Sequence, residues 1–223
     1  MAAVEQGLCA ARVYQWSEAT VSLGYFQDAA AVSSSALSNL PMVRRLSGGG
    51  AILHHLELTY SCVVPAGHHL AAEPGTLYEV VHEAIIALLA RHGILARMRQ
   101  KSERLKDTAF LCFGRGDPRD VLVDGHKILG SAQRRRRGAI LQHGSLLLRR
   151  SPHAPQFPGV LDLVPDAARH LVDAANELAH EVASSLGGSI GAERLDEAIK
   201  NRAVVLERAK YRSLDWRGNP SSE

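Results

Sequence analysis

The sequence predicts an α+β domain built on a mixed, mostly antiparallel sheet flanked by helices. Three observations predict it: short β-type runs fill the first half of the chain, one long amphipathic stretch interrupts them, and the last quarter has helical periodicity. The 223 residues are 46% hydrophobic, which is enough for one domain with a sizeable core and short for two. We therefore expect a single domain over residues 1–223.

The first half is expected to form short strands joined by tight connections. Apolar and β-branched runs predict strands at Arg12–Trp16, Thr20–Gly24, Val43–Leu46, Ala51–His55 and Thr59–Val64. Pro65 closes the last of these runs, since proline cannot donate to a sheet.

One helix is expected to separate two groups of strands. Thr76 can serve as its N-cap, apolar residues from Leu77 to Leu89 recur with a period of 3.6, and Gly93 follows its expected end at Arg91. The second group of strands is expected at Phe110–Phe113, Asp120–Val123, Lys127–Ser131 and Ala139–Leu148. Asp124-Gly125 between two of them is a strong hairpin signal.

The remaining residues are expected to form a connector and two helices. Four prolines make Ser151–Pro165 a stiff connector rather than an element. Helical patterns follow at Asp166–Leu186, which stops at Gly187, and at Ala192–Ala209. We thus expect a core over residues 12–150, a connector over 151–165, C-terminal helices over 166–210, and no separate accessory domain.

Positive charge is concentrated locally although the net charge is only +3. Arg91–Lys106 holds six Lys or Arg residues, and Arg134–Arg137 is a run of four arginines. A local basic surface indicates an acidic partner, and a solvated face is the alternative. A nucleic-acid-binding module is a further alternative, but no aromatic residue lies between Phe113 and Phe157 to stack on bases.

Cysteine usage indicates a reducing compartment, so we expect the cytoplasm. Cys9, Cys62 and Cys112 are odd in number, and their spacings fit neither a disulfide framework nor a metal site. No stretch approaches the roughly 20 apolar residues of a membrane span, and the N-terminus lacks the pattern of a signal peptide.

Two glycine-containing segments suggest the walls of an acyl-binding site. In Ser47–Ala51, three successive glycines follow Arg44 and Arg45, which can pair with a phosphate or carboxylate. The segment matches neither a Walker A motif nor the GxGxxG dinucleotide pattern, and a flexible loop is the alternative.

The second wall begins with Lys127. Small residues, Gly130 and Ala132, leave room for a ligand near this lysine, whose alternative role is a solvated strand position. His143-Gly144 follows in the next strand, either as part of the wall or as a core histidine that bonds a backbone carbonyl.

Cys112 is the candidate nucleophile. It precedes Gly114, Arg115 and Gly116, and a nearby cation lowers a thiol pKa and populates the thiolate. Burial as a small hydrophobe is the alternative, and it is the expected role of Cys62.

These motifs resemble the lipoate–protein ligase and octanoyltransferase superfamily, which shares the biotin protein ligase catalytic fold. RRLSGGGAILHH (44–55) resembles its arginine–glycine signature. DGHKILGSAQRRRRGAILQHGSLLL (124–148) resembles its lysine strand and the following His-Gly strand, and VSLGYFQ (21–27) its early strand. The resemblance covers roughly residues 13–148, and His54-His55 departs from the usual His-Asp or His-Asn.

The resemblance implies the residues of the site. The acyl-binding lysine falls on Lys127, and Cys112 falls on a catalytic cysteine of one branch. The expected substrate-binding residues are Arg45, Ser47, Gly48, Gly49, Gly50, Ala51, His54, Gly130, Ser131, Ala132, His143 and Gly144. No metal ligand is expected.

Within the superfamily, Cys112-Phe113 and the segments GSAQ and LQHGS are similar to the cysteine-dependent octanoyltransferases. The resemblance then implies transfer of an octanoyl or lipoyl group from an acyl carrier protein thioester, through a Cys112 acyl-enzyme, without a cofactor. The acceptor would be a lysine of a lipoyl-domain protein or a glycine cleavage H-like protein, with no membrane or nucleic acid involved.

The rival reading is an ATP-dependent lipoate–protein ligase. In that case Arg45 and the glycines cradle an adenylate phosphate, ATP and Mg are required, and Cys112 is a bystander. A non-catalytic lipoyl-binding relative is a third reading if Cys112 is buried and inert.

Overall fold

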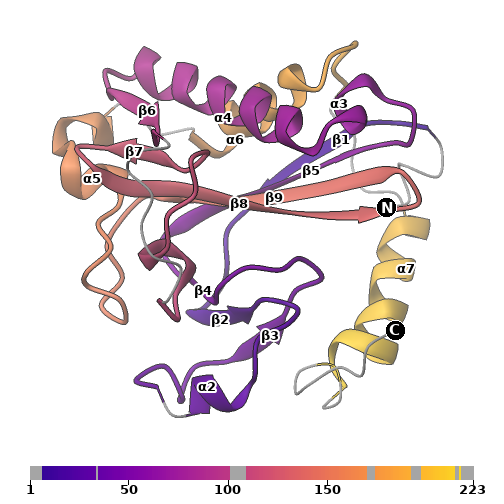
Figure 1. The fold of residues 1–223 in the computed structure, drawn as a ribbon, viewed down its shortest axis with the longest axis horizontal. Helices are drawn as coiled ribbons and strands as arrows, with labels where there is room; N and C mark the ends of the chain where they lie inside the picture. Colours follow the sequence, from indigo (N-terminus) through magenta and orange to yellow (C-terminus); the bar gives the residue numbers. More distant parts are fainter. Residues whose placement is uncertain are drawn as a thin grey trace.

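The computed structural model describes residues 7–33, 35–100, 109–169, 174–191, 197–213 and 216. They form two sheets, one large and one small (Figure 1). The large sheet has the order β1 (Ala10–Tyr14), β5 (Glu57–Val64), β9 (Ala139–Leu147), β8 (His126–Arg136), β7 (Val121–Val123) and β6 (Ala96–Met98), and every neighbouring pair is antiparallel.

The small sheet makes the architecture mixed. Its central strand β2 (Thr20–Leu23) pairs in parallel with β3 (Met42–Arg44) and antiparallel with β4 (Ile52–His54). It lies on the side of the large sheet opposite α4 (Pro74–Arg91) and α6 (Ala174–Ser185), as Figure 1 shows. The α+β expectation with a mixed, mostly antiparallel sheet is therefore confirmed.

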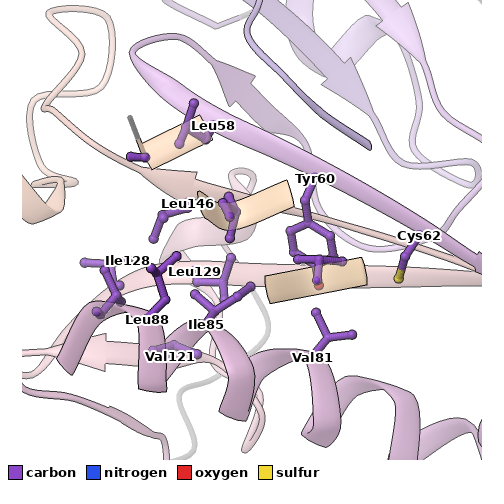
Figure 2. Packing of buried hydrophobic residues seen from close by; sticks show 14 of the residues in the cluster. Leu58, Tyr60, Cys62, Val81, Ile85, Leu88, Val121, Ile128, Leu129 and Leu146 are labelled. Atoms are coloured by element: carbon purple, nitrogen blue, oxygen red, sulfur yellow. The ribbon is translucent and has the colours of Figure 1, made fainter. Parts of the chain in front are cut away.

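The main core lies between the large sheet and α4. Tyr60 of β5, Leu129 of β8 and Ile85 of α4 are fully buried there and face one another (Figure 2). The 3.6-residue repeat of α4 places its apolar side chains on the sheet, which is why the repeat in the sequence predicts the helix correctly. The helix begins at Pro74 with Glu73 as its N-cap, three residues earlier than expected, because proline suits the first turn, where its missing N–H is not needed.

The hairpins follow the turn chemistry of the sequence. Asp124 and Gly125 have φ values of 47° and 79°, as the predicted two-residue turn requires. Arg137 and Gly138 make a similar turn, with φ values of 49° and 80°. This second turn lets β8 continue through the arginine run, so the strand extends five residues beyond its expected end at Ser131.

The arginine run therefore lies on a strand and its hairpin turn. Arg134 lies over the Tyr25 ring, and Arg135 donates to the Ala71 carbonyl. Arg134, Arg135 and Arg136 are exposed. An acidic partner for this surface stays a prediction, and of the other basic segment the residues 101–106 lie outside the described residues.

The expected strand Phe110–Phe113 is wrong. Only Leu111 bridges to Ala51, after which Cys112–Gly114 forms a 3-10 turn. The Gly114 N–H bonds the Leu111 carbonyl within this turn, so the backbone leaves the extended conformation directly after one bridge.

The C-terminal elements are more broken than the periodicity suggests. The expected helix Asp166–Leu186 consists of a 3-10 turn at Pro165–Arg169 and α6, and residues 170–173 between them are not described. The expected connector contains a short helix, α5 (Val160–Leu163), because Asp162 caps it by accepting from the Gly159 N–H.

The second expected C-terminal helix is found as α7 (Glu197–Leu206), followed by a π turn at Glu207–Tyr211, and its expected start at Ala192 lies outside the described residues. Two further short helices, α2 (Ala30–Ser33) and α3 (His69–Ala72), and strand β6 have no counterpart among the expected elements. In the described ranges no helix is both long and apolar enough to cross a membrane.

The buried face of α4 gives a stability prediction. We expect Ile85→Ala to lower the free energy of unfolding by about 2–5 kcal/mol, because it leaves a cavity in the main core. Urea unfolding followed by circular dichroism measures this loss. Val204→Ala is the control, since Val204 on α7 is 42% exposed and should change stability by less than about 0.5 kcal/mol. Equal effects of the two substitutions would contradict the assigned core.

Candidate active site

One pocket brings together residues from four distant parts of the sequence. The empty space at this pocket is about 720 Å³, which includes open solvent at its mouth. Its walls come from Ser47–Ala51, here called the glycine segment, from α4, from the turn and loop after Leu111, and from β8. The lining residues are Gly49, Gly50, Tyr78, His82, Cys112, Arg115, Gly116, Asp117, Arg119, Asp120, Lys127 and Ser131.

Lys127 is buried in the pocket wall rather than solvated. Its Nζ lies 2.9 Å from Oδ1 of Asp120 and donates to the backbone carbonyls of Cys112, at 3.1 Å, and Arg115, at 3.4 Å. A buried ammonium needs such partners because leaving water is costly for a charge. The lysine therefore ties β8 to the turn that carries Cys112.

Asp120 is the partner of Lys127, and sequence reasoning did not single it out. Its second oxygen, Oδ2, accepts from the Asp117 N–H and lies 3.6 Å from Nε of Arg99. Burial raises the pKa of this carboxyl, and the positive charge of Lys127 opposes that rise. Its position in the sequence could have indicated this role. Asp120 directly precedes β7, and β7 pairs with the start of β8, where Lys127 lies.

Gly130 makes room for Lys127 itself. A Cβ at this position would lie 2.7 Å from Cε and 3.0 Å from Nζ of Lys127. The sequence analysis expects a small residue here to leave room for a ligand, but in the structure the lysine side chain fills the space at Gly130. Gly144 acts similarly, since a Cβ there would lie 2.2 Å from Oγ of Ser131 and 2.5 Å from Cε1 of Tyr60.

Cys112 reaches the pocket with a free, half-buried thiol. Its backbone N–H donates to the Ala51 carbonyl at 2.7 Å, which fixes the turn against the end of the glycine segment. Cys62, by contrast, is fully buried in the core, and burial raises the pKa of its thiol to about 12. The core role expected for Cys62 fits this placement, and of these two cysteines Cys112 is the one that lines the pocket.

Of the two signature arginines, Arg45 holds the glycine segment through its carbonyl groups. Arg45 donates to the carbonyls of Ser22, Gly48 and Gly50, and burial lowers the pKa of its guanidinium to about 10. Gly24 is required beside this segment, because a Cβ there would lie 2.1 Å from the Gly49 carbonyl oxygen.

Arg44 is almost fully buried and serves the neighbouring turn. It donates to the carbonyls of Gly24, Tyr25 and Gln27 and, through Nε, to that of Trp216. The Trp216 indole N–H returns a bond to the Arg44 carbonyl at 3.0 Å. The bonds described for both arginines thus go to backbone oxygens of the protein.

His143 lies behind the glycine segment rather than on the pocket lining. Its Nε2 lies 2.5 Å from Oγ of Ser47, so its partner is a hydroxyl and not the backbone carbonyl weighed from the sequence. Burial, reinforced by the charges of Arg45 and His54, lowers the pKa of the imidazole to about 3. A neutral His143 thereby connects β9 to the glycine segment.

His54 is further from the pocket. It pairs through Nδ1 with Glu57 at 2.5 Å, and its ring stacks on Trp16 with 4.2 Å between centroids. Ala51 lines a separate apolar recess with Leu111 and Phe113. Of the expected site residues, the structure gathers Cys112, Lys127, Ser131, Gly49 and Gly50 on one pocket. It leaves the others off that lining: Arg45, Ser47, Gly48, Ala51, His54, Ala132, Gly130, His143 and Gly144.

His82 is a pocket residue that the sequence analysis missed. It stands on the sheet-facing side of α4, 1% exposed, with Nε2 2.7 Å from Oγ of Ser131 and Nδ1 2.6 Å from the Arg119 carbonyl. Burial lowers the pKa of this imidazole to about 4. A histidine within the apolar stripe of a helix was the signal for it. Among the described residues, no group of three or more His, Cys, Asp or Glu is placed to hold a metal ion.

Comparison with known proteins agrees with these motifs. The family model of the lipoyl protein ligase A/B catalytic domain matches residues 2–201. The chain belongs to this family. It is an enzyme family, so the superfamily resemblance drawn from the motifs and the expectation of an enzyme are both confirmed.

The chain is also similar in sequence to two proteins named octanoyltransferase LipM. That of Kyrpidia tusciae is 36% identical over 203 residues, which cover 84% of this chain and 72% of the relative. That of Bacillus subtilis is 38% identical over 147 residues, covering 61% of this chain and 53% of the relative. The chain thus matches about half the length of the Bacillus subtilis protein.

Solved structures show the same lipoyl protein ligase fold. A lipoate-protein ligase A bound with ATP gives a TM-score of 0.72 at 21% identity, covering 95% of this chain and 86% of that chain. The bipartite lipoate protein ligase of Thermoplasma acidophilum gives 0.66 at 21% identity, covering 96% and 86%. At this identity the likeness establishes the fold alone.

The packing of Lys127 against Gly130 gives a second prediction. In Gly130→Ala the new methyl group displaces the lysine from Asp120, so we expect faster labelling of Lys127 by an amine-reactive reagent and a loss of about 1–3 kcal/mol in stability. Mass spectrometry of the labelled peptide and urea unfolding measure the two effects. Gly75→Ala in α4, where a Cβ meets nothing within 4 Å, is the control and should be neutral or stabilising. Unchanged protection of Lys127 in Gly130→Ala would refute the assigned packing.

The buried His82 predicts a dependence of stability on pH. Between about pH 6.5 and about pH 4 the ring binds a proton in the unfolded state but not in the folded state, so the free energy of unfolding falls as the pH is lowered. Full titration of this group corresponds to about 3 kcal/mol. Urea unfolding between about pH 7 and about pH 4 should show a smaller decrease for His82→Gln than for the wild type. His180→Gln, on an exposed position of α6, should keep the wild-type decrease; the same slope in all three proteins would exclude this assignment.

Proposed function

We propose that this chain is an acyltransferase in protein lipoylation. It moves an octanoyl, or lipoyl, group from the thioester of an acyl carrier protein to a lysine of a lipoyl-domain protein or a glycine cleavage H-like protein. The observation that carries the proposal is that Cys112 lines the same pocket as Lys127, whose ammonium donates to the Cys112 carbonyl at 3.1 Å. The similarity to octanoyltransferases LipM supports the same reaction.

In the first step, the Cys112 thiolate attacks the thioester carbonyl of the donor. A new carbon–sulfur bond forms, the carrier sulfur leaves as a thiolate and takes up the proton that Cys112 lost, and the acyl group stays on Cys112. Covalent catalysis of this kind divides one difficult transfer into two easier ones and needs no ATP. No cofactor is therefore part of the proposed reaction.

Lys127 is proposed to hold the reacting carbonyl. Its three N–H bonds are directed to Asp120, the Cys112 carbonyl and the Arg115 carbonyl. The bond to Arg115 is the longest, at 3.4 Å, so this is the one that a substrate carbonyl would replace. A charged donor at a developing oxyanion typically contributes a few kcal/mol to catalysis.

The ligase alternative uses the same fold and differs in its need for ATP. It would place an adenylate phosphate near Arg45, with ATP and Mg as reactants. In this structure Arg45 instead donates to the three backbone carbonyls of its own segment and of Ser22. The acyl-enzyme is the feature that separates the two chemistries.

The decisive experiment is intact-mass measurement after mixing the protein with octanoyl-carrier protein without ATP. We expect the wild type to gain one octanoyl group that hydroxylamine removes, and Cys112→Ser to gain none. Cys62→Ser is the matched control and should still be acylated, because Cys62 is buried in the core.

Two outcomes would contradict the proposal. Formation of acyl-adenylate from free octanoate and ATP, with no adduct on Cys112, would make the chain a ligase. Binding of the acyl group with neither adduct nor adenylate would make it a non-catalytic lipoyl-binding protein.

A further inference from the structure

A chain of buried hydrogen bonds runs from the Arg119 carbonyl to Gln142 and meets the pocket at His82 and Ser131. His82 links the Arg119 carbonyl, at 2.6 Å, to Ser131 Oγ, at 2.7 Å. Ser131 Oγ in turn lies 2.6 Å from the Tyr60 hydroxyl, to which the Gln142 side-chain amide donates at 2.8 Å. His82, Tyr60 and Gln142 are each at most 1% exposed, so these polar groups depend on one another for their hydrogen bonds.

The Arg119 carbonyl at one end of this chain determines which atom donates in the bonds of His82 and Ser131. A carbonyl oxygen only accepts, so His82 carries its proton on Nδ1 and donates to Arg119. Burial keeps the ring neutral by lowering its pKa to about 4, so Nε2 bears no proton and accepts. Ser131 must therefore donate its hydroxyl proton to His82.

Ser131 is thereby fixed as an acceptor toward everything else. A serine oxygen has one proton and two lone pairs. The proton goes to His82, and one lone pair takes the hydrogen bond that Tyr60 donates. Ser131 lines the pocket, and toward its ligand it offers the remaining lone pair. The position thus suits an N–H or O–H donor and not a carbonyl oxygen.

Two positions on the β8 wall of the pocket consequently differ in polarity. Lys127 presents N–H donors, while Ser131, four residues further along the same strand, presents an acceptor. The thioester carbonyl matches the lysine. The group in the proposed reaction that brings N–H bonds is the primary amine of the acceptor lysine.

We propose that Ser131 Oγ binds and orients the attacking lysine amine in the second half-reaction, with His82 and Tyr60 as positioning residues that fix its polarity. This inference rests on the proposed function. It gives Ser131, which the resemblance implies is a substrate-binding residue, the specific role of holding the nucleophile.

The step balances without an added base. The amine nitrogen, with one N–H directed to Ser131 Oγ, attacks the carbonyl carbon of the Cys112 thioester and forms the carbon–nitrogen bond. The carbon–sulfur bond then breaks, and the proton that the nitrogen loses ends on the Cys112 sulfur. The products are the acylated lysine and the free thiol.

The two half-reactions separate the role of Ser131 from a structural one. We expect Ser131→Ala to form the Cys112 acyl-enzyme at a rate within about threefold of the wild type. The reacting thioester has no N–H or O–H group that would bond to the serine oxygen. Transfer from the isolated acyl-enzyme to an apo lipoyl domain should slow by about 10- to 100-fold, as expected for a lost hydrogen bond to the nucleophile. Intact mass in single-turnover mixing measures both rates.

Variants around the serine test the assigned directions. His82→Ala frees the Ser131 proton to turn into the pocket, so it should also slow transfer selectively. Tyr60→Phe leaves the serine–histidine bond intact and should have a smaller effect. Ser185→Ala is the control, since its hydroxyl donates to the Val182 carbonyl of its own helix, away from the pocket lining, and it should change neither rate.

The outcomes distinguish this inference from the function on which it rests. Unchanged transfer in Ser131→Ala, or equal slowing of acylation and transfer, would overturn the role in amine binding. Absence of any acyl-enzyme in the wild type would instead overturn the proposed function.

Discussion

The buried ion pair between Lys127 and Asp120 is the interaction on which the pocket depends. Removing two charges from water is costly. Further hydrogen bonds offset that cost: Lys127 donates to backbone carbonyls, and Asp120 accepts from the Asp117 N–H. These bonds join β8 to the segment between Cys112 and β7. The turn that carries the candidate nucleophile is therefore held by these charged contacts as well as by the bond from the Cys112 N–H to the Ala51 carbonyl.

Glycine shapes the same region by allowing side chains of the protein to approach its backbone. The missing Cβ atoms of Gly130 and Gly144 admit Lys127 and the Ser131–Tyr60 pair, respectively. The signature arginines also contact the backbone here: Arg45 donates to the carbonyls of Gly48 and Gly50, and Arg44 donates to that of Gly24. Much of what looks like a ligand-binding composition in the sequence is thus used to hold the pocket walls together.

Local sequence signals predicted the elements whose structure is set locally. The repeat of α4 and the Asp124-Gly125 turn were found because periodicity and positive φ leave direct traces in the sequence. The motifs singled out Lys127 and Cys112, and both line the pocket. The prediction of a strand at Phe110–Phe113 was wrong because an apolar run does not show how many of its residues find a pairing partner. In the structure, Leu111 forms an isolated bridge with Ala51. Asp120 and His82 were missed because their roles come from tertiary contacts with β8, which no local pattern records.

The reciprocal bonds between Arg44 and Trp216 join residues 172 positions apart in the chain. Arg44 ends β3 of the small sheet, so the polar partners of this strand are complete only after Trp216 has been made. Contacts of such long sequence separation form late, since a long loop must close before they can stabilise anything. During synthesis on the ribosome, the large sheet and α4 can therefore assemble while the small sheet still awaits its final contact.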